Sequence, residues 1–385
     1  MTPVYFDHNA TTAVDKAVLA AMLPYFQQAY GNPSSRHAYG TIARRAINAA
    51  REQVAHAVGV QPAQVIFTSG GSEANNLFIR GAADSLKPST VFVSAVEHPC
   101  VIRPAQELAR RTCERWNLQR LAVNSLGQVN LDDACAAMEK QNPGLVSVML
   151  ANNETGTIQD VARIAEMARL QGAWMHTDAV QGLGKIPVDF TALKVHAITL
   201  SAHKIYGPKG AAALIVDKRL LLKPLIYGGG HEYGIRSGTE NVPAIVGFGV
   251  ACELAKSRMA ETAKHVTILR EHLEQGLKAM GAVIFGSGAA RIPNTCYFAL
   301  PDIEGDTLVV RLDKAGFAVA SGAACSSVNP GQSHVLEAMG VAPMLARCAV
   351  RVSFGSSNTM MQVEDFLKAT KNIIEELKRM NSVTI

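Results

Sequence analysis

The chain contains 385 residues, of which 48% are hydrophobic and 18% are charged, and its formal net charge at pH 7 is +5. A chain of this length and composition can bury a large core and usually forms two domains, which excludes an intrinsically disordered protein. The net charge is small and no run of basic residues stands out, so we expect no nucleic-acid partner.

The first eight residues have neither the basic start nor the apolar centre of a signal peptide, and no apolar run reaches membrane-spanning length. We therefore predict neither export nor a membrane partner. The seven cysteines are widely spaced, and the nearest pair, Cys100 and Cys113, is separated by 13 positions (113 minus 100). This spacing excludes CxxC metal and redox motifs, so we predict no metal site and reduced thiols in the cytoplasm.

Short apolar runs alternate with helical patterns along the first part of the chain. The runs cover residues 65–68, 91–96, 145–150, 173–176, 197–200 and 211–216. Strands that are apolar throughout are buried on both faces, and their alternation with helices predicts an α/β fold with a mostly parallel sheet. In such a sheet, ligand sites gather at the carboxyl ends of the strands.

The pattern changes after about residue 255. A helical pattern over residues 263–280 precedes an apolar segment over 292–298, a short segment over 307–312 and a final helix over 363–380. We interpret this part as a smaller α+β domain that shares one cleft with the larger domain.

The most informative segment is Ser201-Ala-His-Lys204, which ends an apolar strand and leads into a Gly-Pro-Lys-Gly turn. Lys204 can condense with an aldehyde, and Asp178 lies 26 residues earlier (204 minus 178), after another predicted strand. A lysine that binds an aldehyde and a carboxylate that faces a pyridinium nitrogen are the two fixed points of pyridoxal phosphate chemistry. Taken singly, a surface lysine and a helix-capping aspartate are the simpler explanations.

Gly71 and Ser72 open a helix after the strand at residues 65–68. They offer backbone N–H groups and a hydroxyl to a phosphate, with Ser201 and His203 as further donors from the lysine strand. A simple helix cap is the alternative interpretation of Ser72.

Two further polar residues follow predicted strands. His98 can lie over an aromatic cofactor ring or exchange protons above it, and Asn153 can hold a phenolic oxygen together with a substrate carboxylate. A histidine or an amide that only satisfies a buried neighbour is the alternative in both cases.

Three features lie in the second half of the chain. The glycine-rich loop over residues 228–241 is too long for a plain turn, and such loops often serve a neighbouring subunit. Cys325 lies in a loop of small residues, from which a thiol can reach into a cleft, although an ordinary exposed cysteine is the alternative. Arg351 alternates with apolar neighbours, so its guanidinium needs an anion, either a substrate carboxylate or a structural acid.

With these motifs in order, the whole chain resembles the pyridoxal phosphate cysteine desulfurases of the NifS and IscS type, within the class V aminotransferase group. The most specific pieces are Ser201-x-His-Lys-x-x-Gly-Pro-Lys-Gly, Arg236-Ser-Gly-Thr and the Ser321-Gly-x-Ala-Cys loop. The resemblance implies a fold-type I enzyme with a mostly parallel seven-stranded sheet. Residues 13–258 would form its large cofactor-binding domain, and residues 1–12 and 259–385 the small domain that carries the cysteine loop.

The resemblance also implies a role for each candidate residue. Lys204 would bind the cofactor, Asp178 would hold its pyridine nitrogen, and His98 would stack on its ring. Arg351 and Asn153 would bind the substrate carboxylate. Gln181 and Asn153 would contact the phenolic oxygen of the cofactor. The phosphate would be bound by Gly71, Ser72, Ser201 and His203. Thr239 would reach the phosphate from the second subunit of a homodimer.

The reaction implied by the resemblance converts L-cysteine to L-alanine. Lys204 and His98 would move protons, and Cys325 would take the sulfur as a persulfide for an acceptor such as an iron–sulfur scaffold protein. Two departures from the family are visible. Gly71-Ser72 replaces a common Ala-Thr but keeps the hydroxyl, and the chain ends at Ile385 without the tail that IscS-like members use to dock their scaffold.

Three other functions compete with this one. A selenocysteine lyase or another class V aminotransferase-type enzyme would share the scaffold, although an aminotransferase needs no thiol such as Cys325. The long loop from Cys325 to His334 favours sulfur transfer over a closed selenocysteine pocket. An inactive scaffold for sulfur proteins would predict loss of Lys204 or Asp178, and both are present.

Overall fold

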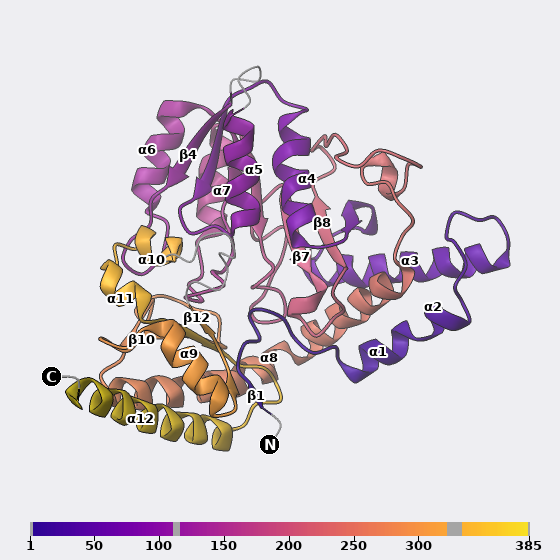
Figure 1. Cartoon of the computed structure of the whole chain (residues 1–385). Helices are drawn as coiled ribbons and strands as arrows, with labels where there is room; N and C mark the ends of the chain where they lie inside the picture. Colours follow the sequence, from indigo (N-terminus) through magenta and orange to yellow (C-terminus); the bar gives the residue numbers. More distant parts are fainter. Residues whose placement is uncertain (1–2, 111–115, 322–332, 384–385) are drawn as a thin grey trace.

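A seven-stranded sheet forms the centre of the larger of two units in this computed structural model, which describes residues 3–110, 116–321 and 333–383 (Figure 1). The strands are β2 (Val65–Thr68), β3 (Thr90–Ser94), β4 (Asn117–Leu121), β5 (Pro143–Ser147), β6 (Trp174–Asp178), β7 (Ala197–Ser201) and β8 (Ala212–Val216). Their order is β2-β8-β7-β6-β5-β3-β4, and only β8 is antiparallel to its neighbours within this sheet of described residues. The prediction of a mostly parallel seven-stranded sheet is confirmed.

Two strands show how local chemistry shapes this sheet. β4 lies at an edge and buries only Leu121 of its five residues, so it has no apolar run that would reveal it in the sequence. β8 follows β7 after residues 202–211. That connection is too short for the crossover that joins parallel strands, so β8 runs antiparallel to β7.

Helices cover both faces of the sheet. Alternate side chains of a strand point to opposite faces, and Phe92 packs in one core cluster whereas Val91 and Val93 pack in another. One face carries α4 (Gly71–Ala83) and α5 (Pro99–Arg110), and the other carries α3 (Ala38–Val58), α6 (Leu131–Gln141), α7 (Val161–Leu170) and the first part of α8 (Val242–Ala279). Two short helices, α1 (Lys16–Met22) and α2 (Pro24–Gln27), pack against α8.

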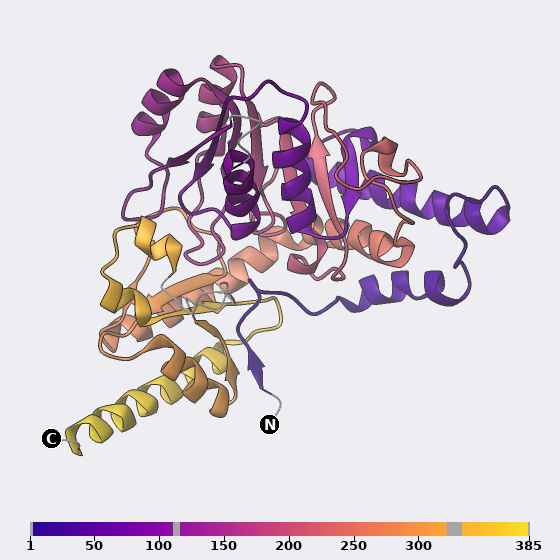
Figure 2. The same ribbon diagram turned by 45° about the horizontal axis from the view of Figure 1, so that its top comes forward.

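The smaller unit contains an antiparallel sheet in the order β12-β13-β10-β9 and a parallel pair of β1 and β11. Its strands are β1 (Val4–Tyr5), β9 (Val283–Ile284), β10 (Thr295–Ala299), β11 (Phe317–Ala318), β12 (Ala320–Ser321) and β13 (Ala349–Ser353). Its helices are α9 (Gly305–Lys314), α10 (His334–Ala338), α11 (Pro343–Arg347) and α12 (Met360–Val383). Figure 2 shows α12, in yellow, at the end of the molecule away from the seven-stranded sheet.

The long helix α8 joins the two units. Its N-terminal residues, such as Phe248, pack in the core of the large unit, whereas later residues, such as Leu269 and Leu273, pack in the core of the small unit. The boundary that the sequence suggests at residues 258 and 259 lies inside this helix. Three 3-10 helices complete the structure, at Pro62–Gln64, Ala202–Lys204 and Glu232–Gly234, and none of the helices described is long and apolar enough to cross a bilayer.

Candidate active site

A pocket at the carboxyl ends of the parallel strands collects most of the predicted site residues. It encloses about 1020 Å³ of space, part of it open to solvent, between the strand ends and the small unit. The candidate residues that line it are Gly71, Ser72, His98, Asn153, Asp178, Gln181, Ser201, His203, Lys204 and Arg351. The sequence therefore predicted where these residues lie, and their roles stay predictions.

Lys204 and Asp178 enter the pocket from neighbouring parallel strands. Asp178 is the last residue of β6, and its carboxylate accepts hydrogen bonds from Asn75 Nδ2 at 2.7 Å and from the Val180 N–H at 3.0 Å. These two donors hold the carboxylate in one orientation. Lys204 follows β7, and its Nζ donates to the main-chain carbonyls of Asn9 and Ala10 at 2.6 and 2.7 Å.

The start of α4 and the end of β7 form a cradle for an anion. A Cβ at Gly71 would meet Val180 Cγ2 at 3.3 Å, so glycine lets the backbone come close to the opposite wall. Ser201 Oγ is buried and has no hydrogen-bond partner among the described residues. Burial next to Lys204 lowers the pKa of His203 to about 4, so its ring is neutral at pH 7.

His98 has a defined proton arrangement. Its Nδ1 accepts a hydrogen bond from the Cys100 N–H at 3.2 Å and lies 2.8 Å from Cys100 Sγ. Burial and the charge of Asp178 raise the pKa of the Cys100 thiol to about 12, so this sulfur keeps its proton. Because Nδ1 accepts and burial lowers the pKa of His98, the neutral ring carries its proton on Nε2.

Arg351 lies on β13 at the small-unit side of the pocket. Its guanidinium donates to Asp7 Oδ1 at 2.7 Å and to the Asn153 carbonyl at 2.9 Å. Its Nε is buried without a hydrogen-bond partner in the described part of the chain. Of the two explanations that the sequence left open, a structural acid is therefore present, and the guanidinium, which uses two of its five N–H groups in these bonds, also lines the pocket.

The structure places one predicted residue outside the pocket and does not describe another. Thr239 is exposed, on a loop held by ion pairs that include Arg51 with Glu232 at 2.6 Å and Arg236 with Glu73 at 2.7 Å. Cys325 lies outside the described residues, although Ala320, five positions earlier (325 minus 320), lines the pocket.

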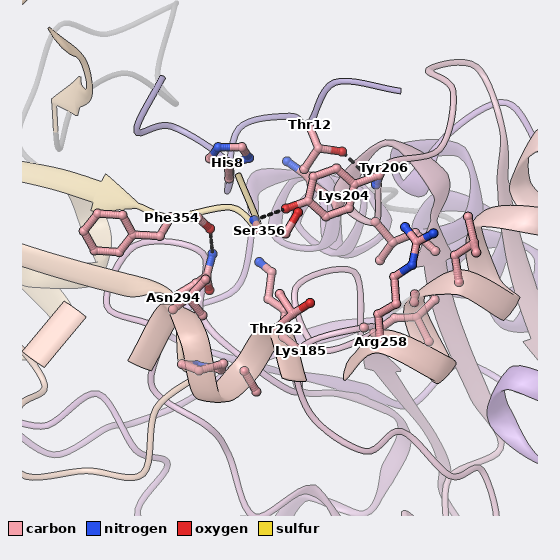
Figure 3. A pocket seen from close by; sticks show the side chains of 18 of the residues that line it. His8, Thr12, Lys185, Lys204, Tyr206, Arg258, Thr262, Asn294, Phe354 and Ser356 are labelled. Atoms are coloured by element: carbon pink, nitrogen blue, oxygen red, sulfur yellow. Dashed lines mark hydrogen bonds between the residues drawn. The ribbon is translucent and has the colours of Figure 1, made fainter. Parts of the chain in front are cut away.

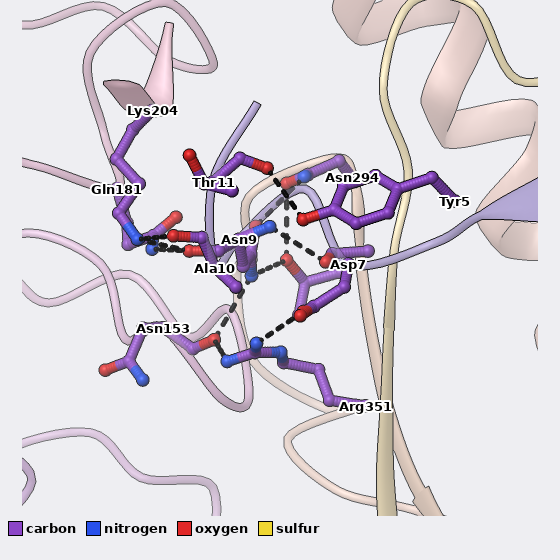
Figure 4. A network of polar contacts seen from close by, with 12 residues as sticks. Tyr5, Asp7, Asn9, Ala10, Thr11, Asn153, Gln181, Lys204, Asn294 and Arg351 are labelled. Carbon is purple, nitrogen blue, oxygen red and sulfur yellow. Dashed lines mark hydrogen bonds and ion pairs between the residues drawn. The ribbon is translucent and has the colours of Figure 1, made fainter. Parts of the chain in front are cut away.

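Asn9 connects the two sides of the pocket, and the sequence alone did not indicate this (Figure 4). Its carbonyl accepts from Lys204 and from Gln181 Nε2, the latter at 2.9 Å. Its amide nitrogen donates to the Asn153 carbonyl at 3.1 Å and to Thr295 Oγ1 at 2.8 Å. A buried asparagine within Asp7-His-Asn-Ala-Thr-Thr was the only signal available, and asparagine has many simpler uses.

A second cavity of about 760 Å³ lies beside the first and shares Lys204 with it (Figure 3). Its walls come from the N-terminal segment, α8 and the small unit, and they include His8, Lys185 and Arg258. Burial lowers the pKa of His8 to about 4, so this ring is neutral at pH 7. Within the described ranges, no group of three or more His, Cys, Asp or Glu side chains is arranged to hold a metal ion.

Comparison with known proteins identifies the class of this protein. Residues 4–366 match the class V aminotransferase family. The chain is 40% identical to a cysteine desulfurase of Gluconacetobacter diazotrophicus, over 99% of this chain and 96% of the relative. It is also 40% identical to the cysteine desulfurase IscS of Colwellia psychrerythraea, over 98% and 94% of the two chains.

Solved structures agree with this assignment. A NifS-like protein superposes with a TM-score of 0.91 at 37% identity, covering 97% of this chain and all of the other. SspA in complex with cysteine superposes with a TM-score of 0.80 at 30% identity, covering 92% of this chain and all of the other. The chain therefore belongs to the class V aminotransferases. Its predicted resemblance to cysteine desulfurases is confirmed, and its cofactor is pyridoxal phosphate.

The residues present fit this cofactor. The buried Ser201 hydroxyl, which has no partner within the part of the chain that the structure describes, and the glycine cradle at Gly71 offer a site for the phosphate. At the other end, the Asp178 carboxylate is fixed by its two donors and is suited to a protonated ring nitrogen. Lys204 supplies the amine that binds the aldehyde.

Proposed function

We propose that this protein is a cysteine desulfurase that converts L-cysteine to L-alanine and transfers the sulfur to Cys325 as a persulfide. The observation that carries the proposal is the convergence of Lys204, Asp178 and Arg351 on one pocket. When bound there, pyridoxal phosphate supplies an electron sink for the substrate carbon atoms.

Each side chain has a task in this proposal. Arg351 and Asn153 bind the substrate carboxylate and orient L-cysteine, with Asp7 holding the guanidinium in place. Asp178 keeps the ring nitrogen protonated, and Gln181 donates to the phenolic oxygen. Lys204 moves a proton at the substrate Cα, and the Asn9 and Ala10 carbonyls hold its amine when it is free.

The sulfur transfer balances without an external oxidant. The Cys325 thiolate attacks the substrate sulfur, an S–S bond forms, and the Cβ–S bond of the substrate breaks. The electron pair of the broken bond takes a proton at Cβ, which becomes the methyl group of alanine. His98, with its proton on Nε2, is placed in the pocket to exchange protons during these steps.

We also propose a homodimer in which Thr239 of each chain reaches the phosphate site of the other. Support comes from the exposed position of Thr239 on a loop that Arg236 ties to Glu73 near the start of α4. Large exposed apolar side chains between α1 and α3, such as Phe26 and Tyr30, are typical of a covered surface.

The destination of the sulfur and the domain division are proposals as well. We propose an acceptor protein such as an iron–sulfur scaffold, supported by the similarity to a protein named IscS. A cytoplasmic location is supported by the free thiols of Cys100, Cys135, Cys252, Cys296 and Cys348. Residues 13–258 form the cofactor-binding domain in this proposal, and residues 1–12 and 259–385 form the small domain with Cys325.

One experiment tests the central proposal. Holoenzyme given L-cysteine and a reducing thiol should release alanine and sulfide in equal amounts, and Cys325→Ala should release neither at a significant rate. Cys135→Ala, at a partly exposed cysteine on α6, is the matched control and should behave as wild type. Full activity of Cys325→Ala would reject the persulfide route, and alanine without sulfide would indicate another reaction.

A further inference from the structure

A partly buried lysine, Lys185, contacts two residues that line the cofactor pocket. Lys185 follows β6 in a turn, and part of its side chain faces the second cavity (Figure 3). Its amine donates to Gln181 Oε1 at 2.5 Å and to Asn9 Oδ1 at 2.9 Å. Neither the sequence motifs nor the mechanism above assigns it a task.

The contact with Lys185 determines which end of the Gln181 amide can face the pocket. An amine donates to oxygen, so Oε1 must point to Lys185 and Nε2 must point away from it. In this orientation Nε2 donates to the Asn9 carbonyl at 2.9 Å. A reversed amide would set acceptor against acceptor at the Asn9 carbonyl and would lose the hydrogen bond that Lys185 donates to Oε1.

The Lys185 amine also binds Asn9, the residue whose carbonyl accepts a hydrogen bond from Lys204. Asn9 Oδ1 accepts from Lys185 and also from Asn294 Nδ2 at 3.1 Å. The carbonyl of the same residue accepts from Lys204 Nζ at 2.6 Å. Lys185 therefore contacts two residues that line the cofactor pocket, Gln181 and Asn9.

The surroundings of Lys185 also affect the pKa of its amine. Burial lowers the pKa of Lys185 well below its ordinary value, and the positive charges of Lys204 and Arg351 lower it further. The amine has at least two N–H groups in either protonation state, and these match the two oxygen acceptors that Lys185 meets. It can thus orient both amides.

We propose that Lys185 is a positioning residue for the cofactor pocket, which holds Gln181 so that its N–H group, and not its carbonyl, faces the phenolic oxygen of the cofactor. The inference rests on the proposed contact between Gln181 and that oxygen. Lys185 itself touches neither cofactor nor substrate in this proposal, and it acts through Gln181 and Asn9.

A double-mutant cycle on the holoenzyme tests the proposal. The variants are Lys185→Met, Gln181→Ala and the combination, and the readouts are the visible absorption bands at fixed pH and the rate of cofactor loss on dilution. Lys185→Met should accelerate cofactor loss about tenfold, which corresponds to about 1.4 kcal/mol. In the Gln181→Ala background the same change should add less than about twofold, because its effect passes through the missing amide.

Controls separate this role from general damage. Lys218→Met, at an exposed lysine just after β8, should match wild type, and Lys185→Gln, which keeps one N–H donor group, should give an intermediate effect. If Lys185→Met does not fold, Lys185→Gln replaces it in the double-mutant cycle with Gln181→Ala. If the double variant loses cofactor at a rate that multiplies the two single effects, Lys185 does not act through Gln181 and the inference is wrong. The proposed contact between Gln181 and the cofactor would still hold. Wild-type spectra and cofactor retention in Gln181→Ala would overturn both, whether or not the enzyme proves to be a desulfurase.

Discussion

The two sides of the pocket are held together in different ways. On the side of the seven-stranded sheet, Asp178 ends β6 and Lys204 follows the neighbouring strand β7, and Asp178 is fixed by Asn75 and by a nearby N–H group. On the opposite side, Arg351 depends on Asp7, 344 residues away in the chain. The first set of groups is positioned by the sheet itself, whereas the second exists only when the N-terminal segment and the small unit have assembled.

Substitutions on the two sides of the pocket should therefore have different effects. Groups at the strand ends are proposed to hold and activate the cofactor, so their loss should remove the chemistry. Groups on the opposite side are proposed to bind substrate and to align the two units, so their loss should weaken binding or stability and spare the chemical step.

Lys204→Ala tests the sheet side and should have the largest effect. Without its amine the enzyme has neither the bond to the cofactor nor the base at Cα, so kcat should fall by about 10³-fold or more. Alanine formation and the visible spectrum of the purified protein measure this. Lys218→Ala is the control, and a Lys204→Ala activity within about tenfold of wild type would contradict the assignment.

Arg351→Ala tests the opposite side. Hydrogen bonds to a charged group contribute about 1.5–3 kcal/mol, so the KM for L-cysteine should rise roughly 10- to 100-fold with a smaller change in kcat. Steady-state kinetics over a wide cysteine range measure the two constants. Arg347→Ala, at an exposed arginine at the end of α11, should leave both unchanged. A loss confined to kcat would assign Arg351 to structure or catalysis instead.

The same division explains how far the sequence could predict the site. Asp178, Ser201 and Lys204 each follow an apolar run that marks a buried strand, and parallel strands bring their carboxyl ends to one edge. A short local pattern is therefore enough to place them together. The fold class could be predicted for the same reason, except for β4, whose edge position leaves it without an apolar run.

The remaining features depend on contacts between distant segments. No spacing rule pairs Asp7 with Arg351, and no motif shows that Asn9 meets Lys185, Gln181 and Lys204. The proposed domain boundary is hidden for another reason, because α8 passes without interruption from one core into the other. Such features follow from tertiary packing and not from local propensity.

Asn9→Ala tests the connection between the two sides of the pocket, because it removes the side-chain contacts of Asn9 with both of them. The side chain makes four hydrogen bonds, two as donor and two as acceptor, and Lys185 and Asn294 would each lose one acceptor with it. Each lost hydrogen bond costs about 0.5–1.5 kcal/mol, so the thermal midpoint should fall by several degrees. Calorimetry of the holoenzyme measures this, with Asn372→Ala on the exposed side of α12 as the control. An unchanged midpoint would show that Asn9 does not join the two sides.

Glu97→Gln should have the smallest effect on activity, although the residue lies on the sheet side. Burial raises the pKa of Glu97 to about 8, and its carboxyl oxygen meets Ser94 Oγ and the Met149 N–H. At pH 7 a neutral amide would replace a mostly neutral carboxyl, so activity should stay within about twofold. The unfolded chain loses this proton near pH 4.5, so between pH 4.5 and 8 the wild type should lose stability relative to Glu97→Gln as the pH rises. Denaturation midpoints of both proteins across this range measure the trend, and a difference that is constant or reversed would show that Glu97 is ionised in the folded protein.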